Sequence, residues 1–154
     1  MWAVNDAKSR GMKLPIIYNT SGYENVTELK LLEGIVDVYL PDFKYMDSTL
    51  SARYSRAKDY PSVAKQALSE MVRQQPDVVI DDATRLIQKG VIVRQLLLPG
   101  HVNAAKAVLK YLYDTYHDHV YISMMSQYTP VRKFKEHTEL NRKVTKREYE
   151  RYIQ

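Results

Sequence analysis

Apolar residues fall into four short runs along the chain, and each run is followed by polar or turn-forming residues. The runs are residues 14–19, 35–45, 90–100 and 119–130, and they are rich in valine, isoleucine, leucine, methionine and tyrosine. Short runs that are nearly continuous, without strict alternation, are typical of strands that are covered on both faces. The pattern therefore predicts four buried strands.

Segments with helical periodicity lie before, between and after these runs. They are residues 2–11, 26–34, 48–75, 103–117 and 140–153. The segment 48–75 is expected to form two helices, because Pro61 suits the first turn of a second helix. Between this segment and the third strand, residues 76–90 are expected to form a small hairpin around Asp81 and Asp82.

Side chains that can cap a helix mark three of the predicted helix starts. Asn25, Asn103 and Thr145 are the predicted N-cap residues. Glu28 follows Asn25, and Glu148 follows Thr145, at the spacing of a capping box. We therefore expect three well-defined helix starts.

The order of the elements predicts the fold class. Helix and strand alternate along the chain, which indicates a parallel sheet of about four strands with helical crossovers. A chain of 154 residues is long enough to bury a core of its own. We expect one α/β domain over residues 1–154, with a small inserted hairpin.

The composition indicates where the protein is located in the cell and which partners it does not bind. With 45% hydrophobic and 27% charged residues the chain is typical of soluble proteins, and it lacks the apolar run of about 18 residues that a membrane span needs. The net charge is +5, but the basic residues of the last quarter are interleaved with acids, as on a solvated helix face. We expect a cytoplasmic protein that binds neither a membrane nor a nucleic acid.

Several kinds of chemistry are excluded or disfavoured. The chain has no cysteine, so it contains no disulfide, no thiolate metal site and no cysteine nucleophile. Its four histidines show no metal-ligand spacing. A glycine-rich nucleotide loop and a nucleophile elbow are also missing from the sequence.

Polar or turn-forming residues follow each of the four predicted strands at the point where it ends, and after the third strand they include Pro99, Gly100 and His101. The carboxyl ends of parallel strands meet at one rim, which is where ligands bind in α/β folds. Turns also use asparagine, serine and glycine for backbone reasons alone. Polar residues at the strand ends can therefore either bind a ligand or simply form the turns. The residues are Asn19, Thr20, Ser21, Asp42, Lys44, Gln127 and Tyr128.

Three charged residues favour the interpretation of the rim as a ligand-binding site. Asp42 and Lys44 are two positions apart at a strand end, so their side chains share one face. Arg94 interrupts the apolar run VIVRQLLL, where a buried guanidinium needs an anionic partner. The rim is therefore a candidate site for an anionic ligand.

Four segments resemble the later part of radical S-adenosylmethionine (SAM) proteins, in the branch of pyruvate formate-lyase activating enzyme. They are LPIIYNTSGY, VDVYLPDFKYMD, GVIVRQLLLPGH and VYISMMSQYTP, and the similarity runs from about Ala3 to Ile153. The resemblance implies a partial (β/α)6 barrel. Its last four strands would be those of this chain, which would then be the C-terminal portion of the barrel.

The resemblance also implies roles for the rim residues. Thr20 and its neighbours would lie at the SAM pocket, although Asn19 stands where the family has an acid and Ser21 where it has an amide. Lys44 would meet the SAM carboxylate, and Asp42 would help to order the site.

Arg94, followed by Pro99 and Gly100, is similar to the arginine of the next strand and would be a second contact for that carboxylate. Gln127 and Tyr128 lie where the family approaches the adenine.

The family's chemistry needs more than this chain provides. In radical SAM enzymes a three-cysteine motif holds a [4Fe-4S] cluster, and SAM is cleaved to methionine and a 5′-deoxyadenosyl radical that abstracts a hydrogen atom. In the activating enzymes that hydrogen comes from a glycine of a partner glycyl radical enzyme. Because the chain has no cysteine, we expect it to be inactive by itself, with weak or absent SAM affinity.

Other interpretations remain open. A stand-alone α/β domain could use Asn19, Asp42, Lys44 and Arg94 to bind an anionic metabolite without redox chemistry. A phosphoacceptor domain centred on Asp42 is disfavoured, because no acidic pair follows the first strand. If the chain is the C-terminal portion of a barrel, its first strand lacks a neighbour, and this open edge predicts self-association.

Overall fold

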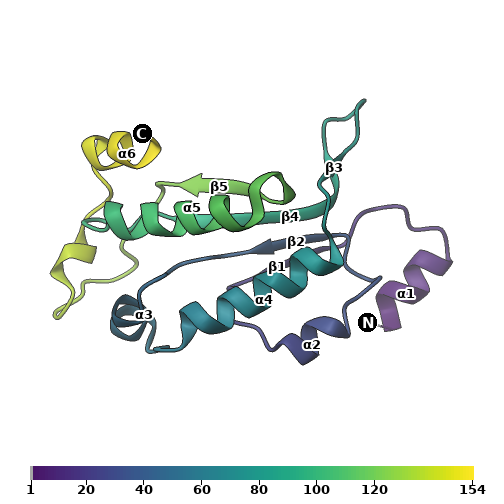
Figure 1. The fold of residues 1–154 in the computed structure, drawn as a ribbon, viewed down its shortest axis with the longest axis horizontal. Coiled ribbons are helices and arrows are strands. Elements are labelled where there is room, and N and C mark those ends of the chain that lie inside the picture. The colour runs from purple at the N-terminus through teal and green to yellow at the C-terminus, as the bar shows by residue number, and fades with distance from the viewer. Residues whose placement is uncertain (1) are drawn as a thin grey trace.

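Helices and strands alternate along the chain in the computed structural model, which describes residues 2–154 (Figure 1). The strands are β1 (Ile17–Thr20), β2 (Val38–Pro41), β3 (Val79–Ile80), β4 (Ile87–Leu96) and β5 (Tyr121–Met125). The helices are α1 (Trp2–Ser9), α2 (Val26–Lys30), α3 (Ser48–Ser55), α4 (Tyr60–Gln74), α5 (Val102–Tyr116) and α6 (Lys146–Ile153). Two short 3₁₀ turns are η1 (His117–His119) and η2 (Thr138–Asn141).

The sheet contains four parallel strands in the order β1-β2-β4-β5, and β3 pairs with β4 in an antiparallel hairpin. This confirms the predicted α/β class, the parallel sheet and the inserted hairpin. The parallel strands follow one another in sequence order, as in the wall of a β/α barrel, whereas a doubly wound sheet reverses its order at a switch point.

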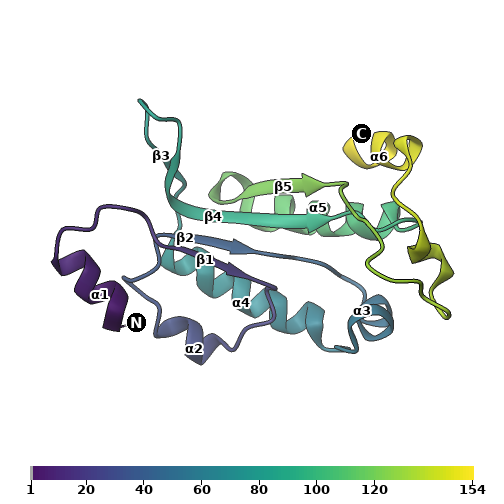
Figure 2. The ribbon, with the colours of Figure 1, turned by 180° about the vertical axis from the view of Figure 1, so that it is seen from behind.

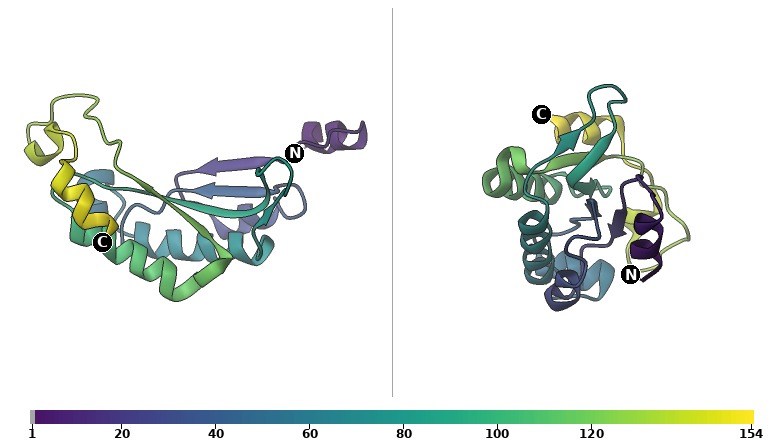
Figure 3. Two further views of the ribbon diagram at one scale, coloured as in Figure 1. Left: turned by 90° about the horizontal axis from the view of Figure 1, so that it is seen from above. Right: turned by 90° about the vertical axis from the view of Figure 1, so that its right-hand side faces the viewer.

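Helices cover one face of the sheet. The views in Figure 3 show α2, α4 and α5 on the same side of the strands. Val91 and Val93 of β4 point to that side and are fully buried, whereas Ile92 and Arg94 alternate with them and are only partly buried. The prediction that helices cover both faces therefore holds for one face: within residues 2–154 no helix lies across the second face, although Val38 of β2 on that face is fully buried.

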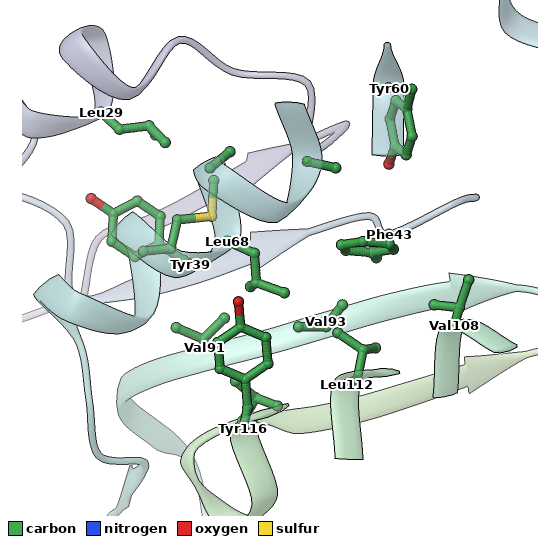
Figure 4. Packing of buried hydrophobic residues seen from close by; sticks show 14 of the residues in the cluster. Leu29, Tyr39, Phe43, Tyr60, Leu68, Val91, Val93, Val108, Leu112 and Tyr116 are labelled. Carbon is green, nitrogen blue, oxygen red and sulfur yellow. The ribbon is translucent and has the colours of Figure 1, made fainter. Parts of the chain in front are cut away.

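The core lies between the sheet and the helices α4 and α5. In Figure 4, Tyr39 of β2 and Val91 and Val93 of β4 lie close to Leu68 of α4 and Leu112 of α5. Each of these side chains is at most 2% exposed. Burial of one large apolar side chain contributes about 1.5–3 kcal/mol to folding, so this layer holds the helices against the strands.

The predicted helix starts were right in part. Asn25 is the N-cap of α2, but its side chain accepts from the N–H of Thr27, so the predicted capping box with Glu28 is replaced by a tighter local turn. Thr145 and Glu148 do form the predicted box of α6.

Two helix boundaries were wrong. Helix α5 begins at Val102, and His101, not Asn103, is its N-cap residue. The backbone already turns at Gly100, whose φ is +82° and whose N–H donates to a carboxylate of α6 at 2.7 Å. The last helix begins at Lys146, because residues 138–141 form the separate turn η2.

The parallel strands all direct their carboxyl ends to one side of the molecule. Figure 2 shows α3 and the segment that follows β5 on that same side. The rim predicted from the sequence is therefore a real feature of the fold.

Candidate functional site

Three charged side chains meet at the carboxyl ends of β2 and β4. Asp42 and Arg94 are bridge partners in adjacent strands, and Asp42 Oδ1 lies 2.7 Å from Arg94 Nη2. Asp42 Oδ2 lies 3.6 Å from Lys44 Nζ. The acid and the lysine share one face, as predicted, and Asp42 is the anionic partner that Arg94 was expected to need.

Asn19 joins this group from the end of β1. Its side-chain oxygen Oδ1 accepts a hydrogen bond from Arg94 Nη2 at 2.7 Å. We call Asn19, Asp42, Lys44 and Arg94 the strand-end cluster. Its members come from three neighbouring parallel strands, so the sheet itself positions them.

The strand-end cluster has one positive charge in excess, because two cations surround one carboxylate. It also has a spare donor, since Arg94 Nε is buried and has no hydrogen-bond partner among the described residues. A buried donor without an acceptor costs about 1–3 kcal/mol. The side chains of Arg94 and Asp42 are 25% and 23% exposed, so a ligand can reach them from solvent.

A pocket of about 250 Å³ opens beside the strand-end cluster. Asp42, Lys44 and Arg94 form its charged wall. Its remaining lining is largely apolar, apart from one hydroxyl of α3 and one phenol, and consists of Tyr45, Ser55, Leu96, Leu98 and Met125. A ligand with a charged head and an apolar body matches this division.

Tyr60 holds the backbone of the rim in place. Its hydroxyl lies 3.0 Å from the carbonyl oxygen of Ser21 and 3.1 Å from that of Asp42, and it accepts the N–H of Lys44 at 3.0 Å. Burial raises the pKa of Tyr60 far above its ordinary value, so the hydroxyl keeps its proton. One side chain therefore connects the turn after β1 with the turn after β2.

Thr20 and Ser21 build the turn after β1. The hydroxyl of Thr20 donates to the carboxylate of Glu24 and accepts the N–H of Gly22 at 3.2 Å. Thr20 is buried, and Ser21 contributes its carbonyl to Tyr60. Of the predicted residues, these two shape the rim and do not belong to the strand-end cluster.

Gln127 and Tyr128 follow β5 and lie outside the lining of the pocket. Gln127 Nε2 approaches Met125 Sδ at 3.5 Å, so it is next to a lining residue. The hydroxyl of Tyr128 donates to the carbonyl of Leu140 at 2.9 Å and so fixes the segment after β5. The predicted approach of these residues to an adenine stays a prediction.

Sequence reasoning missed Tyr60, Tyr45 and Ser55. Tyr60 lies 39 residues from Ser21, so no local pattern connects them. The one available signal was Gly22, because a glycine shortly after a strand is typical of a close backbone approach; its φ in the structure is +77°.

Residues 2–154 meet neither the requirements of a metal site nor those of a membrane-spanning helix. No group of three or more histidine, aspartate or glutamate side chains is placed to hold a metal ion, and the chain has no cysteine. Within the same residues, no helix combines the length and the apolarity that crossing a bilayer requires.

Comparison with known proteins found one long similarity. An uncharacterized protein of Methanocaldococcus jannaschii is 29% identical to this chain over 141 residues, which are 92% of this chain and 37% of that protein. The chain therefore spans little more than a third of the length of this relative. No protein-family model matches the sequence, and no solved structure matches it.

Proposed function

We propose that the strand-end cluster binds the carboxylate of SAM, and that the chain is the later part of a radical SAM barrel resembling pyruvate formate-lyase activating enzyme. The observation that carries this proposal is the meeting of Asp42, Lys44 and Arg94 at one rim, with a positive charge in excess. The sequential strand order supports it, because a barrel wall is built in that way.

A carboxylate suits the donors of this site. One negative charge balances the excess cation, and its two oxygens provide acceptors for Lys44 Nζ and for the unpaired Arg94 Nε. Hydrogen bonds between charged groups are about twice as strong as neutral ones. Asp42 holds both cations in place, so their side chains lose less conformational entropy when a ligand binds.

An iron–sulfur cluster does not suit this chain. The [4Fe-4S] cluster of radical SAM enzymes needs thiolates, and the chain has none. When SAM is bound next to such a cluster it supplies the 5′-deoxyadenosyl radical. The part assigned to this chain is to bind and orient SAM, within a cytoplasmic parent enzyme whose substrate would be a glycyl radical enzyme.

Titration with SAM tests the proposal. We expect weak binding, with a Kd on the order of 1 mM, because this chain supplies only part of the contacts. Arg94→Gln and Lys44→Gln should each weaken binding about ten-fold or more, since a hydrogen bond to a charged group is worth about 1.5–3 kcal/mol.

The matched control is Lys110→Gln, which removes a 2.8 Å ion pair with Asp114 on the exposed face of α5. It should leave the affinity for SAM unchanged. Circular dichroism confirms that each variant is folded. If the two rim variants bind SAM as well as the parent chain does, the strand-end cluster is not the SAM carboxylate site.

A second candidate function is a self-sufficient domain that binds an anionic metabolite. It is favoured by the fact that every member of the strand-end cluster comes from this chain. Succinate or acetate binding as tightly as SAM would support it. The genomic reading frame upstream of Met1 also separates the two, because a C-x3-C-x2-C motif there favours the radical SAM parent.

A further inference from the structure

A second pocket, rich in basic side chains, lies on the same rim between α3 and the segment after β5. Its volume is about 380 Å³. We call it the basic pocket. Five cationic side chains and one carboxylate line it, and they are Arg53, Arg56, Arg132, Lys133, Lys135 and Glu136.

Most of these cations are not neutralised. Arg53 pairs with Glu139 at 2.9 Å and donates to His137 at 3.3 Å. The other four cations, from Arg56 to Lys135, form no ion pair within residues 2–154. Because only Glu136 adds a negative charge to the lining, the basic pocket has an excess of positive charge that a single carboxylate would not balance.

The walls of the basic pocket are held by hydrogen bonds. The side chain of Asn141 bonds to both the N–H and the carbonyl of Phe134, at 2.7 and 2.8 Å. On the opposite wall, Tyr54 bonds to His101 at 2.8 Å and donates to the carboxylate of Glu139. The backbone that presents the cations is thereby fixed before a ligand arrives.

Flat apolar groups lie beside the cations. Arg132 lies over the ring of Phe134, 5.3 Å from its centre, and Tyr54 also lines the basic pocket. The basic pocket therefore combines an anion site with surfaces that suit the organic part of a small molecule.

We propose that the basic pocket binds a small phosphorylated metabolite. A phosphate ester carries a charge of about −1.5 to −2 and three acceptor oxygens, which match several unpaired cations better than a carboxylate does. Arginine guanidinium groups bind phosphate oxygens in pairs. The volume lies within the range of about 300–1,000 Å³ that is usual for small-molecule sites.

The inference does not rest on the SAM proposal, because the two sites use different residues. Consecutive residues line the two pockets, since Ser55 lines the pocket beside the strand-end cluster and Arg56 lines the basic pocket.

Calorimetric titration at constant ionic strength tests the inference with inorganic phosphate, ribose 5-phosphate and ribose. Both phosphate compounds should bind, ribose 5-phosphate more tightly, and ribose should not. The double variant Arg56→Gln/Lys133→Gln should weaken ribose 5-phosphate binding at least ten-fold. The matched control Lys13→Gln/Lys106→Gln, which removes two exposed lysines elsewhere, should leave it unchanged.

Several results would overturn the inference. They are a lack of binding by the phosphate compounds, equal binding of ribose, and a double variant that binds as the parent chain does while remaining folded by circular dichroism. Tighter binding of a poly-glutamate peptide or of a single-stranded oligonucleotide, lost in the same double variant, would assign the basic pocket to a macromolecule instead.

Discussion

Gly22 brings the first strand end into contact with the second. A Cβ atom at this position would lie 2.1 Å from the carbonyl oxygen of Asp42, which is far closer than atoms can approach. The backbone φ of +77° is also one that residues with a side chain rarely adopt. The geometry of the strand-end cluster thus depends on the missing side chain of a glycine.

Gly22→Ala should therefore destabilise the protein far more than Gly34→Ala does. Gly34 has nearly the same φ, +75°, but a Cβ there would meet nothing within 4 Å, so its cost is the backbone strain of about 1–2 kcal/mol. Gly22→Ala adds a clash, and overpacking costs about 1–3 kcal/mol more. Urea denaturation measures the free energy of unfolding of both variants. Equal decreases would show that the close approach of Gly22 to Asp42 is unimportant for stability.

Part of the strand-end cluster could be predicted from single residues. The spacing of two between Asp42 and Lys44 was enough to put both side chains on one face. The position of Arg94 within an apolar run was enough to indicate that it needs an acid. Tyr60 could not be predicted, because its three hydrogen bonds reach residues that only the folded sheet brings near it.

At the scale of elements, Glu148 joins α6 to the start of α5. Its carboxylate accepts the N–H of Gly100 at 2.7 Å and that of Thr145 at 2.8 Å, and it forms two hydrogen bonds with Arg142. The bonds from Arg142 are the main reason that the pKa of Glu148 lies well below its usual value. One side chain therefore connects the capping box of α6 with the turn that precedes α5.

Glu148→Gln should destabilise the protein by about 1–3 kcal/mol at pH 7, because the donors of Gly100, Thr145 and Arg142 lose a charged acceptor. The folded pKa of Glu148 is lower than the unfolded one, so the charged form contributes stability above the unfolded value of about 4.3. That contribution is lost as the pH falls towards the folded pKa. The difference between variant and parent should therefore shrink in acid.

Denaturant unfolding at several pH values checks this dependence. Glu150→Gln is the control, because Glu150 makes only an exposed pair with Lys146 at 3.7 Å, and such pairs are worth about 0–1 kcal/mol. If Glu148→Gln lowers the free energy of unfolding by the same amount at every pH, the charge of Glu148 does not contribute to stability.

The elements themselves followed from the sequence more readily than their ends did. Helical periodicity and short apolar runs were visible in the chain and located the helices and strands, although they did not show that helices cover one face of the sheet. The start of α5 was placed at the wrong residue because the backbone already turns at Gly100, whose N–H donates to Glu148, 48 residues further along the chain. Local patterns contain no information about such a partner.

For the whole molecule, the sheet ends in an open edge at β1. In the described residues, β1 pairs only with β2, and Ile17 of β1 is 52% exposed. Unpaired strand edges recruit other chains. The predicted self-association through β1 is not tested by the structure and remains a prediction.

Sedimentation over a range of concentrations tests it. We expect a concentration-dependent dimer that Ile17→Lys weakens, because a charged edge residue opposes strand pairing. Leu86→Lys is the matched control, since Leu86 is 63% exposed but lies outside β1, and it should leave the dimer intact. A clean monomer at high concentration would contradict the prediction.

The central claim is that the strand-end cluster binds a carboxylate of SAM, and the Nε–H of Arg94 reports on it most directly. This donor is buried and has no hydrogen-bond partner within residues 2–154, so a bound carboxylate should shift its signal in a ¹⁵N-resolved NMR spectrum. We predict a shift on addition of SAM and none with decarboxylated SAM, which lacks only the carboxylate. An unchanged Arg94 signal with SAM, or equal shifts with both compounds, would contradict the claim.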